Sequence, residues 1–215
     1  MMGVSHMASG FATGLWSSLA VAPLGVPAQV VWTFTSAAFS LAPDIDHPGS
    51  NAARMWGPLS RVPAGVVGRV FGHRGATHQI VGATIGAAVL VAVAWLAPYG
   101  QAFTVAFAVG MLLSAGANVK GGANILVSAA CGYGATTLDW DAWWIPIPAA
   151  IGVATHIIGD SLTTNGAPGR HGRRWGLRAF TTGSPAEAAV CVLIAASIAA
   201  FPVREQLADR LIGAW

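Results

Sequence analysis

Seven long stretches of this chain contain almost no charged side chains, and this pattern constrains the fold more than any other feature. Asp, Glu, Lys and Arg make up 9% of the 215 residues, whereas a soluble domain carries about 25%. A surface with so little charge would be poorly solvated. The apolar stretches cover residues 7–22, 28–42, 79–97, 102–118, 122–136, 143–160 and 186–202.

The sequence therefore predicts an all-α protein, a polytopic membrane helical bundle with about seven short transmembrane helices. We expect one domain over residues 1–215. Most stretches fall short of the about 20 residues that cross a bilayer comfortably. The stretch 122–136, which contains Gly132 and Gly134, is a candidate re-entrant segment.

The basic residues predict an orientation for such helices. If seven spans are threaded through a bilayer, every Lys and Arg except Arg204 and Arg210 falls on one side. The positive-inside rule makes that side cytoplasmic, in an inner (plasma) membrane of bacterial type. We expect membrane lipids as partners. Nucleic acid is not expected, because the arginines are scattered and no recognition motif accompanies them.

Side chains that bind metal ions collect on the same predicted side. His156 and Asp160 are four residues apart on a predicted helix, so they share one face. Asp44 and Asp46 follow Pro43, where a helix should end. The full set of candidate ligands is His6, Asp44, Asp46, His73, His78, His156 and Asp160.

Imidazole and carboxylate ligands without a thiolate suit Zn²⁺ best, with Mn²⁺ and Fe²⁺ as alternatives. One or two ions are expected. Each candidate has a structural alternative: a core hydrogen bond for His6 and for the His156–Asp160 pair, turn formation for Asp44 and Asp46, and orientation of another ligand for His73.

Arg74, Glu187 and His171 are the other polar residues of interest. Arg74 lies between two of the candidate histidines and is suited to clamping a phosphate oxygen. Ser184-Pro185-Ala186-Glu187 matches a helix capping box, which is a structural role for Glu187. The sequence leaves open whether Glu187 and His171 join the site.

Five motifs in order resemble one known family. They are His6 with Gly10, PDIDH at 43–47, HRGATH at 73–78, the His156–Gly166 segment, and TTGSPAE at 181–187. In these the chain resembles the YdjM-type inner-membrane proteins, predicted to be membrane-bound metal-dependent hydrolases. The ligand order is also similar to that of zinc-dependent phospholipase C and the P1-type nucleases. That similarity implies His6, Asp44 or Asp46, His78, His156 and Asp160 as metal ligands.

The function expected from these features is metal-dependent hydrolysis at the cytoplasmic face, with a phosphoester such as a lipid or lipid-linked headgroup as substrate. Asp44, Asp46 and Arg74 are the expected catalytic residues. One alternative is a divalent-cation transporter, which would need ligands near the bilayer midplane. The other is a membrane scaffold with a purely structural metal site.

Overall fold

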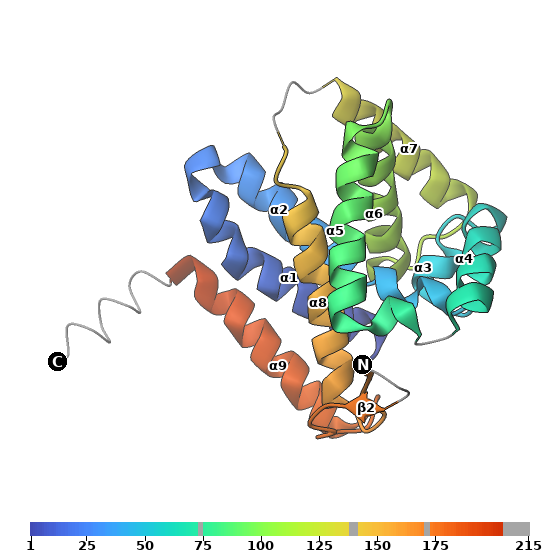
Figure 1. The fold of residues 1–215 in the computed structure, drawn as a ribbon. Coiled ribbons are helices and arrows are strands. Elements are labelled where there is room, and N and C mark those ends of the chain that lie inside the picture. The colour runs from blue at the N-terminus through green and yellow to red at the C-terminus, as the bar shows by residue number, and fades with distance from the viewer. Residues whose placement is uncertain (73–74, 138–141, 170–172, 204–215) are drawn as a thin grey trace.

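The computed structural model describes residues 1–72, 75–137, 142–169 and 173–203, and these residues are mostly helical (Figure 1). Four 3₁₀ helices accompany the α-helices: η1 (Ser18–Leu24), η2 (Ala42–Asp46), η3 (Ala76–His78) and η5 (Phe201–Val203). Two short strands, β1 (Ala167–Pro168) and β2 (Arg174–Trp175), pair antiparallel. The α-helices are α1 (Gly3–Ser17), α2 (Val26–Phe39), α3 (Asn51–Arg54), α4 (Pro58–Phe71), α5 (Ile80–Leu96), α6 (Gly100–Gly116), α7 (Gly122–Thr136), α8 (Pro146–Leu162) and α9 (Pro185–Ala200).

The predicted helical character is confirmed, but the prediction of a polytopic bundle of transmembrane helices is wrong. Each of the seven apolar stretches overlaps an α-helix, and α7 matches the predicted 122–136. Within the described residues, however, no helix combines the length and apolarity needed to cross a membrane. Even α5, α6 and α8 have only 17 residues each. That length rises about 26 Å, against a hydrocarbon core of about 30 Å.

Proline and glycine set the helix ends around the candidate site. Pro43 follows α2 and opens η2, which carries the two predicted Asp ligands. Helix α4 begins at Pro58 and is followed by Gly72 at φ +72°, a backbone conformation that favours glycine. Helix α9 begins after Ser184, whose hydroxyl accepts a hydrogen bond from the N–H of Glu187. The predicted N-cap is therefore confirmed.

Helices α1, α2 and α8 pack so closely that their contacts admit only glycine. A Cβ added at Gly10 would lie 2.5 Å from Ser40 Oγ, and one at Gly14 would lie 2.7 Å from Ser36 Cβ. At Gly152 on α8 it would lie 2.3 Å from the backbone oxygen of Ser36. This three-helix contact fixes the positions from which α1 and α8 present their histidines.

The largest buried apolar cluster joins α2, α5 and α8. Trp32 and Phe39 of α2 pack there with Val153 and Ile157 of α8. A second cluster of Leu41, Ala52, Met55, Met111 and Ala115 lies where α3 packs on α6. The candidate ligands thus lie at the edge of a close-packed apolar core, and this packing restrains the movement of their side chains.

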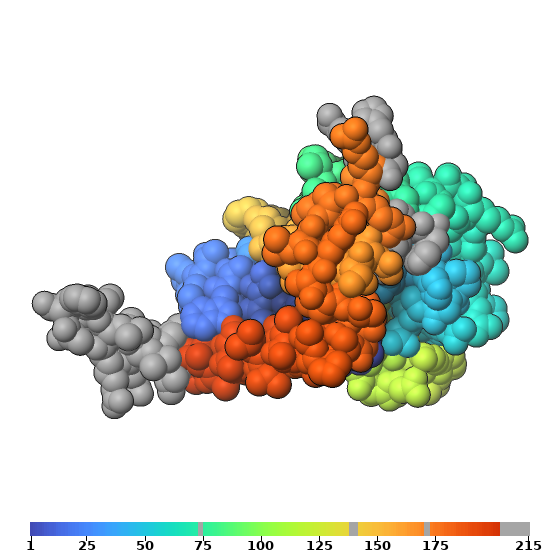
Figure 2. Space-filling view, turned by 90° about the horizontal axis from the view of Figure 1, so that it is seen from below, coloured from blue at the N-terminus to red at the C-terminus, as the bar shows by residue number. Residues whose placement is uncertain are grey.

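The segment that follows α8 covers one end of the molecule. Figure 2, which views this end, shows the segment with β1 and β2 (orange) between α9 (red) and the α3–α4 region (cyan). Backbone N–H groups of Ala179 and Phe180 donate to the carbonyl of Leu162, the last residue of α8. The C-terminal end of α8, where the predicted ligand Asp160 lies, is therefore held by this segment.

Candidate metal centre

Five of the predicted ligands meet beside the C-terminal half of α8. His6 comes from α1, Asp44 from η2, His78 from η3, and His156 with Asp160 from α8. The side chains of His6, His78, His156 and Asp160 are buried, whereas that of Asp44 is 27% exposed. Four segments far apart in the sequence therefore form one buried cluster that opens toward solvent at Asp44.

Four atoms of this cluster form a small cage: Nε2 of His78, Nε2 of His156, Oδ1 of Asp44 and Oδ2 of Asp160. The two nitrogens are 3.2 Å apart. The four separations between a nitrogen and an oxygen range from 3.7 to 3.8 Å. Tetrahedral ligands at about 2.0–2.2 Å from an ion are about 3.3–3.6 Å from one another. The five separations that involve an imidazole nitrogen are therefore close to those expected among the ligands of a tetrahedral Zn²⁺ ion.

Hydrogen bonds on the far side of each ring aim both Nε2 atoms into the cage. Nδ1 of His156 lies 2.7 Å from the carbonyl oxygen of Ser40. A carbonyl only accepts, so this Nδ1 carries the proton and the neutral ring has its lone pair on Nε2. Nδ1 of His78 lies 3.1 Å from Thr77 Oγ1 and 3.4 Å from Asp46 Oδ2, and the Thr77 hydroxyl donates to Asp46. Such bonds commonly orient metal-binding histidines.

The pKa values of the two facing histidines are shifted in opposite directions. Burial lowers the pKa of His156 to about 3, and the neighbouring His6 adds to this effect. Burial would also lower the pKa of His78, but hydrogen bonds with Asp44 and Asp46 raise it to about 9. The raised pKa of His78 favours its protonated form at neutral pH, and its Nε2 lies 3.2 Å from Nε2 of His156. Binding of a metal cation between the two rings would displace that proton.

Both cage carboxylates are held in the ionised form. Burial would raise the pKa of Asp44, but the hydrogen bond with His78 and the nearby His156 hold it well below the usual range. For Asp160 the same burial effect is outweighed by the hydrogen bond with His6. Two carboxylates that stay ionised in a buried pocket favour a cation between them.

His6 adds a second, overlapping group of donors. Its ring stacks on that of His156 with centroids 3.7 Å apart, and its Nε2 lies 3.3 Å from Asp160 Oδ1. The same oxygen accepts a hydrogen bond of 2.9 Å from the amino group of Met1. Nδ1 of His6 is buried and has no hydrogen-bond partner among the described residues. His6, His156 and Asp160 also have the mutual distances of metal ligands.

The remaining predicted residues lie beside the cage or outside the described residues. Asp46 is buried and faces Nδ1 of His78, so it contacts the cage from behind. His73, Arg74 and His171 fall outside the described residues.

Glu187 belongs to a separate network. Its carboxylate accepts from the backbone N–H groups of Met2 at 2.8 Å and Gly183 at 2.7 Å. Burial would raise the pKa of Glu187, but these two bonds lower it. Glu187 thus ties the start of α9 to the segment that leads into α1.

Sequence reasoning missed two residues that hold the cage. Ser40 offers its carbonyl to His156, and its hydroxyl donates to the carbonyl of His6 at 2.9 Å. No pattern in the sequence indicates this role, because a backbone carbonyl carries no residue signature. Thr77 bonds both Asp46 and His78. Its place inside the HRGATH motif, directly before a predicted ligand, is a signal that could have identified it.

These features define a helical protein with a buried His and Asp cluster that has the geometry of a metal site. Residues 1–117, more than half of the 215-residue chain, match the family described as YdjM inner membrane protein. The chain belongs to this family, as its motifs predicted, and the family supports a membrane location. No curated protein and no solved structure matches the chain. The similarity in ligand order to zinc-dependent phospholipase C stays a prediction.

Proposed function

We propose that this protein is a metal-dependent hydrolase that acts on phosphoesters at a membrane surface, with a lipid or lipid-linked headgroup as substrate. One observation carries the proposal: donor atoms of Asp44, His78 and His156 lie 3.2–3.8 Å from one another, and Oδ2 of Asp160 lies within 3.8 Å of both imidazole nitrogens. Membership of an inner membrane protein family supports the membrane surface as the place of action. Zn²⁺ is the favoured ion, with Mn²⁺ or Fe²⁺ as alternatives.

Each residue of the site has a distinct role in the proposed reaction. When bound, a divalent ion supplies Lewis acidity and lowers the pKa of water. Asp44 is the solvent-accessible member of the cage, so substrate approaches from its side. The Asp44 carboxylate orients the attacking water. Asp46 and Thr77 keep the His78 ring turned toward the cage, and Arg74 is the proposed donor to the phosphate.

We propose a single ion in the cage. Both groups of candidate ligands include His156. Since Nδ1 of His156 is bonded to the carbonyl of Ser40, this ring has only Nε2 to offer, and one nitrogen binds one ion. His6 then serves by stacking on His156 and by holding Asp160 through its Nε2.

The proposed site faces the cytoplasm. The segments next to the cage are rich in arginine. Arg54, Arg61 and Arg69 lie on α3 and α4, between η2 and η3 in the chain, and Arg174 and Arg178 follow α8. Basic segments next to a membrane are concentrated on its cytoplasmic side.

A structural metal site is the second candidate, and the burial of the cage favours it. Of the four cage residues, only Asp44 has an appreciably exposed side chain. A fully closed shell would hold the helices together without binding substrate. The two candidates differ in whether a bound ion turns over a phosphodiester.

Metal content and hydrolysis of the purified full chain test the proposal. The protein in detergent is loaded with Zn²⁺, dialysed, and analysed for bound zinc by mass spectrometry. Hydrolysis of bis(4-nitrophenyl) phosphate is then followed at the same protein concentration. We expect about one zinc per chain and zinc-dependent hydrolysis.

Two variants and a matched control make the result decisive. His156→Gln should lose both zinc and hydrolysis, because it removes a cage atom. Asp44→Asn should weaken zinc binding less than His156→Gln does, because an amide oxygen can still face the ion, and at saturating zinc it should lose hydrolysis at least about 100-fold. His47→Gln is the control, since His47 is next to these motifs but exposed, and its Nδ1 accepts from the backbone N–H of Gly49. Zinc binding without hydrolysis in the unmodified protein would favour the structural site, and no zinc binding would refute both.

A further inference from the structure

Helix α4 carries an exposed apolar stripe along its outer side. We call Leu59, Val62, Val66 and Val70 the outer stripe. Their exposed fractions range from 54% to 69%. The spacing of three, four and four residues places them on one face of the helix. The opposite face is buried through Ser60 and Ala64. An exposed run of branched apolar side chains marks a surface that something covers.

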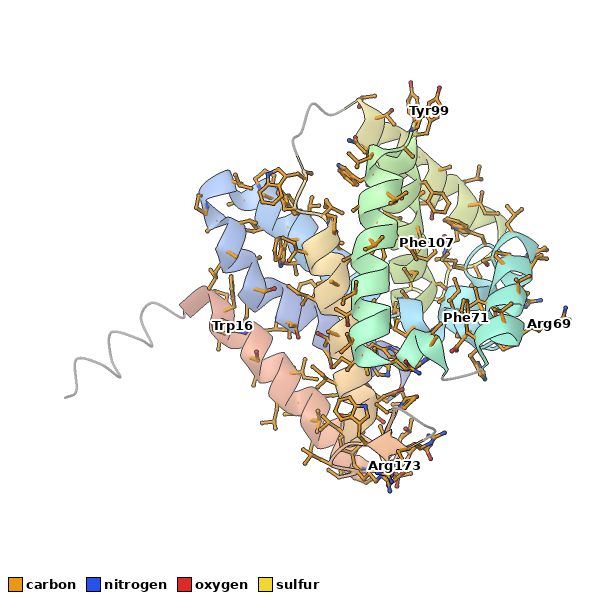
Figure 3. All side chains as sticks on the ribbon, in the orientation of Figure 1. Trp16, Arg69, Phe71, Tyr99, Phe107 and Arg173 are labelled. Carbon is orange, nitrogen blue, oxygen red and sulfur yellow. The ribbon has the colours of Figure 1, made fainter. Side chains whose placement is uncertain are left out.

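One arginine borders the outer stripe. Arg69 is in the last turn of α4, and at about 100° per residue it lies about 65° from the centre of the stripe. Its side chain is exposed, and Figure 3 shows it pointing away from the bundle. An apolar face with a basic residue at its border is typical of a helix that lies in a membrane interface.

Helix α4 also packs directly against the candidate metal centre. A Cβ added at Gly68 would lie 2.6 Å from the backbone oxygen of Asp46. Asp46 in turn faces His78 of the cage. The helix therefore lies immediately behind the loop that supplies Asp44, with its apolar stripe turned outward.

We propose that the outer stripe of α4 lies in the interface of an anionic phospholipid bilayer, with Arg69 contacting a lipid phosphate. Membership of an inner membrane protein family supplies a bilayer as the surface available to this chain. Arg69 matches its anionic headgroups, with a favourable interaction near the surface. The helix then holds the metal centre at headgroup level. This inference concerns membrane contact and stands whether or not the site is a hydrolase.

Depth-dependent fluorescence quenching tests the proposal on the full chain. Cys131 and Cys191 are first replaced by Ala, and a single bimane-labelled cysteine is introduced as Val66→Cys or Gly65→Cys. The protein is reconstituted into vesicles of phosphatidylglycerol and phosphatidylcholine that contain a nitroxide-labelled lipid. Gly65 is the matched control, because it is adjacent to Val66, lies off the stripe, and has open space for a side chain.

The nitroxide lipid should quench the label at position 66 at least about twice as strongly as the label at position 65. Iodide in the water should show the reverse order. Arg69→Gln should reduce the lipid quenching at position 66. Equal quenching at both positions would overturn the proposal. So would disulfide formation between the position 66 cysteines of two chains, because it would show that a second copy covers the stripe.

Discussion

Replacing Gly152 with alanine should damage the candidate metal centre from one helical turn away. The added Cβ would stand 2.3 Å from the backbone oxygen of Ser36 and 2.8 Å from the backbone nitrogen of Ser40. A carbon and a carbonyl oxygen normally stay about 3.3 Å apart, so α8 and α2 must separate by about 1 Å. Backbone atoms on both sides leave no flexible side chain to absorb this movement.

The same displacement acts on the hydrogen bond that orients His156. That bond joins His156 Nδ1 to the carbonyl of Ser40 and measures 2.7 Å. Lengthened toward about 3.5 Å, it no longer counts as a hydrogen bond. Overpacking costs about 1–3 kcal/mol and the lost bond about 1 kcal/mol. The higher helix propensity of alanine offsets about 1 kcal/mol of this loss in unfolding free energy. The expected net loss of unfolding free energy is about 1–3 kcal/mol.

Two measurements on the purified protein in detergent check this prediction. Thermal unfolding reports the stability, and competition with a chromophoric chelator reports the zinc affinity. The affinity should fall at least about tenfold, as when a group that orients a ligand is lost. Gly86→Ala on α5 is the control, because its Cβ would meet nothing within 4 Å, and it should be neutral or slightly stabilising. If G152A matches G86A in both measurements, the tight α2–α8 contact does not hold the site.

Three further predictions address other parts of the structure. Thr77→Val should weaken zinc binding at least about tenfold in the same competition assay, because Thr77 orients His78 and Asp46. Thr84→Val is the control and should leave zinc binding unchanged, since the Thr84 hydroxyl has no hydrogen-bond partner among the described residues. Zinc affinity measured by titration calorimetry should rise with pH by up to about tenfold per unit and level off above pH 9. The reason is that zinc must displace a proton bound to His78, whose pKa is about 9. An affinity that stays constant between pH 6 and 9 would contradict this displacement. Ser184→Ala should lower the unfolding free energy by about 1 kcal/mol through loss of the α9 cap, and Ser184→Gly by only a few tenths, as measured by chemical denaturation.

The positions of the helices were predictable because apolar content alone determined them. The predicted 79–97 and 102–118 became α5 and α6 within two residues at each end. Helix α4 was not among the predicted stretches, because Pro63 and its arginines interrupt the apolar pattern. Its stripe of Leu59, Val62, Val66 and Val70 has helical spacing and could have indicated the helix. Spanning could not be inferred from apolarity alone, because it also requires length, and α5 and α6 have only 17 residues each.

The candidate site could be predicted only at the level of residue types. The i, i+4 spacing correctly anticipated that His156 and Asp160 share a face, with Nε2 and Oδ2 3.8 Å apart. The sequence did not distinguish Asp44, whose oxygen is in the cage, from Asp46, which faces the other nitrogen of His78. That division depends on the 3₁₀ turn of η2, since two residues in such a turn point in different directions.

The assembly of the cage from both halves of the chain has a consequence for biosynthesis. Asp44 and His78 leave the ribosome early, whereas His156 and Asp160 belong to α8, the eighth α-helix in chain order. A nascent chain that ends before α8 offers only half of the cage, and two ligands hold zinc weakly. Capture of the ion then becomes a late event in folding, so truncated chains should not compete for zinc in the cell.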